Sequence, residues 1–477
     1  MRVLFVYSNQ IADVQPAPPV GLSYVATAAE AAGHQVRLVD LFLGGNRSGR
    51  LRRALRSFRP EVVAVSVRNI DNVIAQRLVG HLARLREQVA LIREESTALI
   101  VLGGSAISIL GGRVLDHIDA DLAVTGEGEE VFPELLARIA TQDDPGRLPG
   151  VYGRGGADGA PSLPRRCAAF GPSGMERWIS WPGYERRGAT WPIQCRRGCP
   201  QHCTYCCYPA IEGSSLRLRP VEEVVAEIRR VAQVARPRCF EFIDSVFNVP
   251  EEYAFRLCEE IIRAGLRARF TAMGMNPRAM SAGLLELMRR AGFNSLMVTP
   301  ESASDTVLSR MRKGFGRAEV IRAAELIRAA RIPSLWFFML GAPGETKETA
   351  EETVSFVEEH LAFADCLPVF TTGVRILPGT RLAEEAICEG YLRPDQDLTA
   401  SVFYVSPLVS EEYLLARVNR AIARCPAVVH AAEDPASSLP GRLSSRLLHL
   451  FGAAPPYWRF YPHFLSLPFV HKSRSRQ

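Results

Sequence analysis

The sequence predicts an α/β protein with two successive sets of strand–helix repeats and a smaller, mostly helical C-terminal module. Short β-branched runs alternate with amphipathic stretches over the first 140 or so residues, and the same alternation resumes near residue 239. A stretch rich in Gly, Pro and Arg separates the two sets. Alternation at this spacing is typical of parallel sheets covered by helices. A chain of 477 residues is also longer than one hydrophobic core usually supports.

The first set of repeats, expected over residues 1–142, indicates a doubly wound parallel sheet. We expect strands at Val3–Tyr7, Gln35–Val39, Val62–Val67, Ala98–Leu102 and Leu122–Thr125, and helices near Leu22–Ala32, Ser48–Phe58, Val73–Glu95 and Glu129–Ala140. Ligands of such sheets bind at the carboxyl ends of the strands. The residues at these ends include Ser66, Gly103, Gly104, Gly126 and Glu127.

The second set of repeats is expected over residues 188–385, after a linker at 143–187 and before a C-terminal module at 386–477. Its strands are expected at Cys239–Ile243, Arg269–Met273, Ser295–Val298, Ser334–Leu340 and Phe370–Ile376. Its helices are expected at Val221–Ala235, Glu251–Ala264, Ala282–Ala291, Ala318–Ala330 and Thr346–Glu359. Repeated units of this kind form another open sheet or a full or partial barrel.

Composition and charge narrow the class of protein. The chain is 47% hydrophobic and 23% charged, as ordinary globular proteins are. The net charge of +6 is small for this length, so we expect no nucleic-acid partner. About five apolar residues follow Met1-Arg2, too few for a signal peptide, and we expect a cytoplasmic protein. Its eleven cysteines then indicate thiolate ligands or buried thiols rather than disulfides.

A cysteine motif carries most of the functional information. Cys199, Cys203 and Cys206 have the spacing Cys-x3-Cys-x2-Cys. Thiolates suit iron–sulfur clusters and zinc, and three ligands on one short loop leave one metal position open. A structural zinc site needs four ligands, and neither a second Cys-x2-Cys pair nor a His-x3-His pair follows. The neighbours that could complete a zinc site lie in the same cramped loop: Cys195, His202 and Cys207.

The segment Arg197-Gly-Cys199-Pro-Gln-His-Cys203-Thr-Tyr-Cys206 resembles the signature of the radical SAM superfamily. The resemblance implies that the three cysteines hold a [4Fe–4S] cluster whose open iron binds S-adenosylmethionine (SAM). Reduction of the cluster then cleaves SAM to methionine and a 5′-deoxyadenosyl radical. The aromatic residue before the last cysteine, Tyr205, is implied to pack near the adenine.

Further segments extend the resemblance over most of the second set of repeats and imply a partial (βα)6 barrel. Asp244 matches the strand end that meets the methionine amino group, through its carboxylate or a neighbouring carbonyl. Glu301 and Ser302 match the strand end that contacts the ribose and the methionyl group. Asp244 and Glu301 have an alternative interpretation as capping residues. Lys313 also matches the family, with a solvated surface lysine as its alternative, and Gly341–Thr346 matches a turn of the barrel.

The first domain resembles the cobalamin-binding domain of a large radical SAM subgroup. The matching segments are Pro19–Tyr24, Gly33–Val36, Val65–Asn69, Gly103-Gly104 and Gly126–Glu129. A corrin lying across the sheet end needs loops without bulky side chains, which these glycines provide. The resemblance therefore implies that cobalamin lies near Ser66, Gly103, Gly104, Gly126 and Glu127.

The cobalt-ligating pattern Asp-x-His-x-x-Gly of cobalamin mutases is absent, and His34, His81 and His117 stand in other contexts. We therefore expect the lower face of a bound cobalamin to be ligated by something other than histidine, or not at all. Some relatives keep this domain without using the cofactor.

The resemblance implies a radical SAM enzyme, foremost a cobalamin-dependent C-methyltransferase. Its substrate would be a small molecule, a specialised-metabolite or lipid precursor, and its electron donor a flavodoxin or ferredoxin. The alternative is a radical SAM dehydratase, cyclase or rearranging enzyme that does not use cobalamin. A zinc-stabilised binding protein is a third possibility. We expect the aromatic segment Phe451–Phe464 to pack on its own barrel, with peripheral membrane contact as the alternative.

Overall fold

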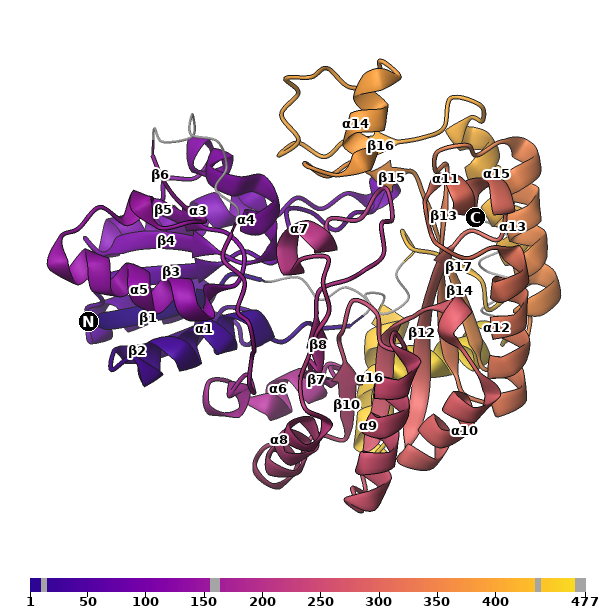
Figure 1. The fold of residues 1–477 in the computed structure, drawn as a ribbon, viewed down its shortest axis with the longest axis horizontal. Helices are drawn as coiled ribbons and strands as arrows, with labels where there is room; N and C mark the ends of the chain where they lie inside the picture. Colours follow the sequence, from indigo (N-terminus) through magenta and orange to yellow (C-terminus); the bar gives the residue numbers. More distant parts are fainter. Residues whose placement is uncertain (10–14, 155–163, 434–438, 468–477) are drawn as a thin grey trace.

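The molecule is built on two sheets, each with helices packed on it (Figure 1). A computed structural model describes residues 1–9, 15–154, 164–433 and 439–467. The first sheet has the order β2-β1-β3-β4-β5-β6, parallel except for the β5–β6 pair. Its strands are β1 (Arg2–Tyr7), β2 (Gln35–Asp40), β3 (Val62–Ser66), β4 (Leu99–Gly103), β5 (Leu122–Val124) and β6 (Val151–Gly153).

Helices cover both faces of the first sheet, as a doubly wound fold requires. They are α1 (Val20–Ala31), α2 (Arg47–Phe58), α3 (Leu82–Glu95), α4 (Ser105–Leu110) and α5 (Gly128–Thr141). Successive residues of β1 point to opposite faces: Phe5 packs on α1 and α5, with its ring centroid 5.4 Å from that of Phe132. Leu4 packs on the face covered by α2, α3 and α4.

The second sheet is an open, fully parallel sheet of order β17-β14-β13-β12-β11-β10-β7. Its strands are β7 (Trp191–Ile193), β10 (Cys239–Phe242), β11 (Arg269–Met275), β12 (Phe293–Glu301), β13 (Ser334–Leu340), β14 (Cys366–Thr372) and β17 (Val429–His430). The main helices on its outer face are α8 (Val221–Val234), α9 (Glu251–Arg263), α10 (Ala282–Ala291), α12 (Arg317–Ala330), α13 (Lys347–His360) and α15 (Glu411–Arg424). This is the predicted partial barrel, with β17 added at its edge.

Shorter elements connect these bodies. They are α6 (Trp181–Glu185), β8 (Arg196–Arg197), α7 (Tyr208–Glu212), β9 (Arg217–Leu218), α11 (Asp305–Arg310), β15 (Val374–Arg375), α14 (Arg381–Cys388), β16 (Phe403–Tyr404), α16 (Leu439–Leu450) and α17 (Tyr461–Leu465). Figure 1 shows α7 between the two sheets, and α7 packs against α4 of the first domain.

The predicted strands and helices agree with the structure except at a few places. The strand expected at Phe370–Ile376 instead spans Cys366–Thr372, and Val374–Arg375 belongs to a separate two-stranded sheet. The helix expected from Val73 begins only at Leu82. The preceding residues form a loop closed by a bridge between Asp71 and Gly80, and Val73 has a φ of +53°, which no helix contains. Short strands β6, β7 and β17 were not predicted from the sequence, because two or three residues carry too little periodicity.

The C-terminal aromatic segment packs on the inner side of the second sheet. Trp458, Tyr461 and Leu465 contact Met297 and Leu335, whose neighbours in the strands face the outer helices instead. This packing confirms the expectation for that part of the segment. Among the described residues, none of the helices has the length and apolarity to cross a bilayer.

Candidate functional site

The three motif cysteines lie in the loop between β8 and α7. Gly198, just before Cys199, has a φ of +86°, and a Cβ there would lie 2.1 Å from the Ser215 carbonyl oxygen. The sequence needs glycine at this turn so that the loop can close on itself. Cys199 N–H donates to the Gly213 carbonyl at 3.0 Å, which fixes the beginning of the loop.

The tip of this loop is fastened to the barrel on two sides. Thr204 N–H donates to the Met311 carbonyl at 3.1 Å, and Leu382 N–H donates to the Thr204 carbonyl at 2.8 Å. Met311 follows α11 and Leu382 lies in α14. The backbone therefore positions the cysteines without help from their own side chains.

The three thiols are half-buried or buried and influence one another electrostatically. Burial raises the pKa of Cys199 and Cys203, and it raises the pKa of Cys206 to about 12. Charges on neighbouring thiols raise the pKa of Cys199 and Cys206 further, and the Glu301 charge raises that of Cys203. The Lys313 ammonium lowers the pKa of Cys199 and Cys203. The unliganded loop favours thiols, so metal binding here is coupled to proton release.

The donor set fits an iron–sulfur cluster. Over residues 1–9, 15–154, 164–433 and 439–467, no three His, Cys, Asp or Glu side chains meet around one point as ligands of a single ion do. In a [4Fe–4S] cluster each thiolate binds a different iron, so the sulfurs stand apart. Three thiols on one fixed loop, each within the electrostatic influence of another, match that requirement.

A buried polar group lies beside the cluster loop. The Tyr205 hydroxyl donates to Glu301 at 3.0 Å, and the Lys313 ammonium donates to the Tyr205 hydroxyl at 3.2 Å and to the Thr299 carbonyl at 3.0 Å. Lys313 also lies 3.5 Å from the Glu301 carboxylate and is 5% exposed, so it is not a solvated surface lysine. Glu301 has a φ of +70°, a strained conformation for a non-glycine residue.

The structure brings together Tyr205 and Glu301, two of the residues predicted to contact SAM. It directs the Ser302 side chain elsewhere, because the Ser302 hydroxyl lies 3.0 Å from that of Thr353 in α13 and accepts from Ser304 N–H. A contact between Ser302 and SAM remains a prediction.

Asp244 follows β10, as predicted, but its carboxylate already accepts hydrogen bonds from the protein itself. It accepts from the backbone N–H groups of Cys195 and Arg196 at 2.9 and 3.0 Å, and from the Cys195 thiol at 2.6 Å. Burial raises the pKa of Asp244, and the Arg196 guanidinium partly offsets this. A contact between this strand end and the SAM amino group therefore stays a prediction. Because the carboxylate is occupied, we expect the neighbouring backbone carbonyls to be the acceptors.

Glycines shape the ligand edge of the first sheet. Gly104 has a φ of +110°, and a Cβ there would lie 2.6 Å from the Val67 carbonyl oxygen. Gly126 has a φ of +76°, and its Cβ would lie 2.5 Å from Pro164. At Gly103 the nearest atom would be 3.9 Å away. The protein's own packing thus explains Gly104 and Gly126, while Gly103 leaves space beside it.

A cavity opens at the carboxyl ends of β1 and β3, near the predicted residue Ser66. It is small, with a volume of about 30 Å³. It lies at the edge where doubly wound sheets bind nucleotide-like ligands, and cobalamin binding here stays a prediction. His81, which lies outside any cobalt-ligating sequence pattern, is in the wall of this cavity. The lining residues are Ser8, Asn9, Val67, Arg68, Asn69, His81, Arg84 and Leu85.

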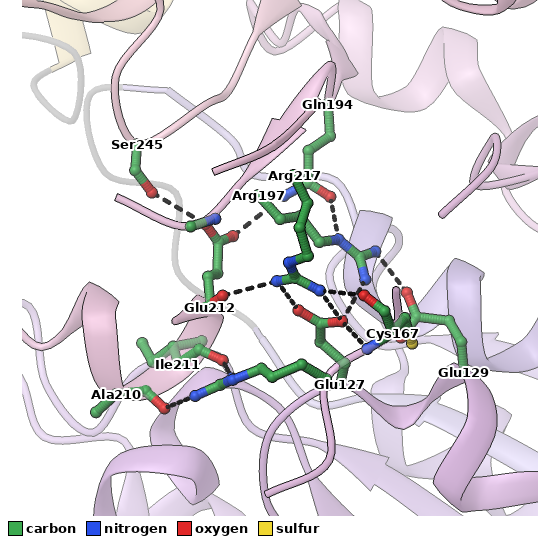
Figure 2. A network of polar contacts seen from close by, with 12 residues as sticks. Glu127, Glu129, Cys167, Gln194, Arg197, Ala210, Ile211, Glu212, Arg217 and Ser245 are labelled. Carbon is green, nitrogen blue, oxygen red and sulfur yellow. Dashed lines mark hydrogen bonds and ion pairs between the residues drawn. The ribbon is translucent and has the colours of Figure 1, made fainter. Parts of the chain in front are cut away.

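Two arginines, Arg197 buried and Arg217 partly buried, join the cluster loop to this ligand edge (Figure 2). Arg217 of β9 donates with both terminal nitrogens to the Glu127 carboxylate. Arg197 of β8 pairs with Glu129 and lies 3.3 Å from Glu127. The side chains of Arg197 and Glu127 are 5% and 7% exposed. The Arg197 guanidinium also lies over the Tyr24 ring, 4.8 Å from its centroid.

Glu127, predicted to lie near cobalamin, is therefore engaged by the protein itself. Burial raises its pKa, but the Arg217 hydrogen bond and the Arg197 charge outweigh this, and the pKa lies below its ordinary value. Sequence reasoning missed Arg217 and Glu212, which Figure 2 shows in the same network; Glu212 accepts from Ser245 at 3.1 Å. Ion-pair partners 90 residues apart leave no local signal.

Two family models match the chain. The model described as the radical SAM superfamily matches residues 193–357, which contain the cysteine loop and most of the second sheet. The model described as the B12 binding domain matches residues 13–136, which contain most of the first sheet. The two matched ranges contain the cysteine motif and the cobalamin-domain segments, respectively.

Known relatives are distant in sequence, and the matched share of their length varies. The chain is 24% identical to tryptophan 2-C-methyltransferase of Streptomyces laurentii over 456 residues, covering 81% of this chain and 75% of that one. It is 25% identical to hopanoid C-3 methylase of Methylococcus capsulatus over 327 residues, 66% of this chain and 59% of that enzyme. It is 24% identical to an uncharacterized methyltransferase of Pyrococcus horikoshii, covering 79% and 80% of the two chains.

The fold is that of a solved structure. The radical S-adenosylmethionine methyltransferase TsrM from Kitasatospora setae, solved with tryptophan and a SAM analogue, superimposes with a TM-score of 0.81 at 21% identity over 99% of both chains. The cobalamin-dependent SAM radical enzyme OxsB superimposes with a TM-score of 0.69 at 13% identity, over 97% of this chain and 72% of that one. At these identities the likeness shows a shared fold.

Proposed function

Because this chain belongs to the radical SAM superfamily, in the subgroup with a B12-binding domain, we propose that it is a cobalamin-dependent C-methyltransferase. It reductively cleaves SAM to a 5′-deoxyadenosyl radical and methylates an unactivated carbon of a small molecule. A specialised-metabolite or lipid precursor is the substrate class, which the similarity to tryptophan and hopanoid methylases supports. A cytoplasmic flavodoxin or ferredoxin supplies the electron.

The observation that carries the proposal is the pair of arginines in Figure 2. Arg197 and Arg217 flank the cysteine loop on β8 and β9, and they hold it against Glu127 and Glu129 at the ligand edge of the first domain. Methyl transfer to a carbon radical requires the radical source and the methyl carrier to face one substrate in a fixed geometry.

When bound, the cluster and SAM supply a radical that removes a hydrogen no side-chain base could remove, and cobalamin supplies the methyl group. The chain's own residues bind and orient. Cys199, Cys203 and Cys206 hold the cluster. Tyr205 and Glu301, fixed by Lys313, form a polar wall beside it that suits the hydroxyl and amino groups of SAM. The carboxyl edge of the first sheet, with Ser66 and Gly103, would hold cobalamin.

The experiment is anaerobic reconstitution with iron, sulfide and hydroxocobalamin, followed by counting of cofactors. We expect one [4Fe–4S] cluster and near-stoichiometric cobalamin by absorbance and electron paramagnetic resonance. The Cys199/Cys203/Cys206→Ala variant should lose the cluster, whereas Cys207→Ala, one residue outside the motif, should keep it. A cluster that persists in the triple variant contradicts the metal assignment.

Products then separate the methyltransferase from its alternative. Remethylation of cobalamin from SAM releases S-adenosylhomocysteine, and radical formation releases 5′-deoxyadenosine. Formation of both with dithionite as reductant supports the methyltransferase. Formation of 5′-deoxyadenosine alone, in a protein that retains no cobalamin, favours a radical SAM dehydratase, cyclase or rearranging enzyme.

A further inference from the structure

Helix α16 leaves an apolar face uncovered. Leu443, Leu447, Leu450 and Phe451 are 50%, 53%, 78% and 86% exposed. The spacing i, i+4, i+7, i+8 places them on one side of the helix, and Phe451 N–H donates to the Leu447 carbonyl at 2.9 Å, which continues the last turn. Leu450 and Phe451 are the most exposed large apolar side chains in the described part of the chain. A contiguous exposed patch of this kind marks an interaction site.

Positive charge is concentrated in the same part of the sequence. Residues 435–477 contain six Arg and Lys and no Asp or Glu, a charge of +6. This equals the net charge of the whole chain, so residues 1–434 are neutral overall. Arg446 is exposed and lies one position before Leu447, beside the apolar face. The uncovered face therefore belongs to a strongly basic segment of an otherwise neutral protein.

The helix is held against the barrel at its C-terminal end. The Arg238 guanidinium donates to the His449 carbonyl at 2.9 Å. The helix dipole also stabilises a cation at this C-terminal end. The Tyr457 hydroxyl lies 3.3 Å from His449 Nδ1. Arg238 directly precedes β10, and Figure 1 shows α16 beside that strand. The apolar residues are thus presented to solvent from a fixed support.

These features favour a lipid surface over other partners. Nucleic acids are bound by basic groups and stacked aromatic rings, and a row of leucines contributes little to them. A second copy of this chain would bring a second +6 segment against the first, which is repulsive. An amphipathic helix with apolar residues on one side and arginines beside them is suited to the interface of an anionic bilayer.

We propose that α16 and Phe451 form a docking surface for anionic lipid bilayers. The leucines and Phe451 enter the boundary between headgroups and acyl chains, while Arg446 meets lipid phosphates. This surface is separate from the cluster loop and the cavity of the first domain, so the proposal does not depend on the reaction that the enzyme catalyses.

The test is co-sedimentation of the full-length holoprotein with extruded vesicles. We expect binding to mixed phosphatidylcholine–phosphatidylglycerol vesicles, weaker binding to phosphatidylcholine alone, and release at high salt. Leu447→Ser/Phe451→Ser should lower the partition coefficient at least about tenfold, because both side chains lose their apolar burial. Arg446→Gln should lower it about fivefold. Leu408→Ser, a change of a 65% exposed leucine elsewhere, is the matched control and should bind like the wild type.

Far-UV circular dichroism checks that the variants fold, which their exposed positions favour. Equal binding to neutral and anionic vesicles, or unchanged binding of the double variant, would overturn the proposal. A wild-type dimer that the double variant converts to monomer, measured by light scattering, would assign the face to a second copy instead. Tighter binding to fluorescein-labelled polyuridine than to mixed vesicles, retained in the double variant, would assign the charge to nucleic acid.

Discussion

Replacing Glu127 by Gln tests whether the buried ion pairs of Figure 2 hold the cluster loop to the first domain. The Glu127 carboxylate accepts from both terminal nitrogens of Arg217 and from Cys167 N–H at 2.8 Å, and Arg197 lies 3.3 Å away. Glutamine keeps the shape but loses the charge and one acceptor oxygen. Buried charge-assisted hydrogen bonds contribute about 1.5–3 kcal/mol each, so we expect a loss of about 3 kcal/mol at neutral pH.

The dependence on pH gives this prediction a second signature. The pKa of Glu127 is lowered in the folded protein from an ordinary value of 4.5. Its contribution to stability is therefore fully present above 4.5 and is lost as the pH falls through the lower, folded-state pKa. The difference between wild type and Glu127→Gln should be largest at neutral pH and shrink below 4.5.

The measurement is urea denaturation followed by far-UV circular dichroism at neutral and acidic pH. Glu129→Gln is the matched control, because Glu129 lies two residues away in the first turn of α5 but is 18% exposed and pairs with Arg197 alone. We expect it to cost about 1 kcal/mol. Equal losses for the two variants, or a loss at Glu127 that does not change with pH, would refute the reasoning.

Three further predictions concern other parts of the fold. Gly104→Ala should destabilise the protein by about 3 kcal/mol, because Gly104 has a positive φ and a Cβ there would clash with the Val67 carbonyl oxygen. Gly103→Ala should cost less than about 1 kcal/mol. Thermal melts that rank the two variants the other way contradict this prediction. Burial raises the pKa of Glu345 to about 7, so stability should fall by up to about 3 kcal/mol as the pH rises from 4.5 through 7, and Glu345→Gln should abolish that slope in denaturation curves. Lys313→Met leaves the buried Glu301 carboxylate without its cation and should cost about 3 kcal/mol. Arg312 is exposed, so Arg312→Gln should change the urea midpoint little. Similar midpoints for the two variants would contradict the role given to Lys313.

The strands and most helices were predictable because their periodicity is local. A β-branched run such as Val62–Ser66 followed by an amphipathic helix defines its own structure. The cysteine loop was predictable for the same reason, since Cys199, Cys203 and Cys206 lie within eight residues of one another. The helix start at Leu82 was not, because the loop before it is fixed by a bridge between Asp71 and Gly80.

Side-chain roles were less predictable than positions. Asp244 lies at the expected strand end, yet the Cys195 and Arg196 backbone groups that occupy its carboxylate are 49 and 48 residues away. The partner of Glu127 could not be chosen from the sequence either, since arginines are spread over the whole chain and the pairing depends on how two domains meet. Long-range contacts decide what a recognisable residue is free to do.

The packing of Trp458, Tyr461 and Leu465 inside the second sheet has a consequence for how such enzymes diversify. These residues stand more than 100 positions from the strands β12 and β13 that they cover, and they share no segment with the cluster cysteines. The depth of the barrel interior is thus encoded separately from its walls. Exchange of the C-terminal segment between homologues could admit a longer or shorter molecule while every residue of the cysteine loop stays unchanged.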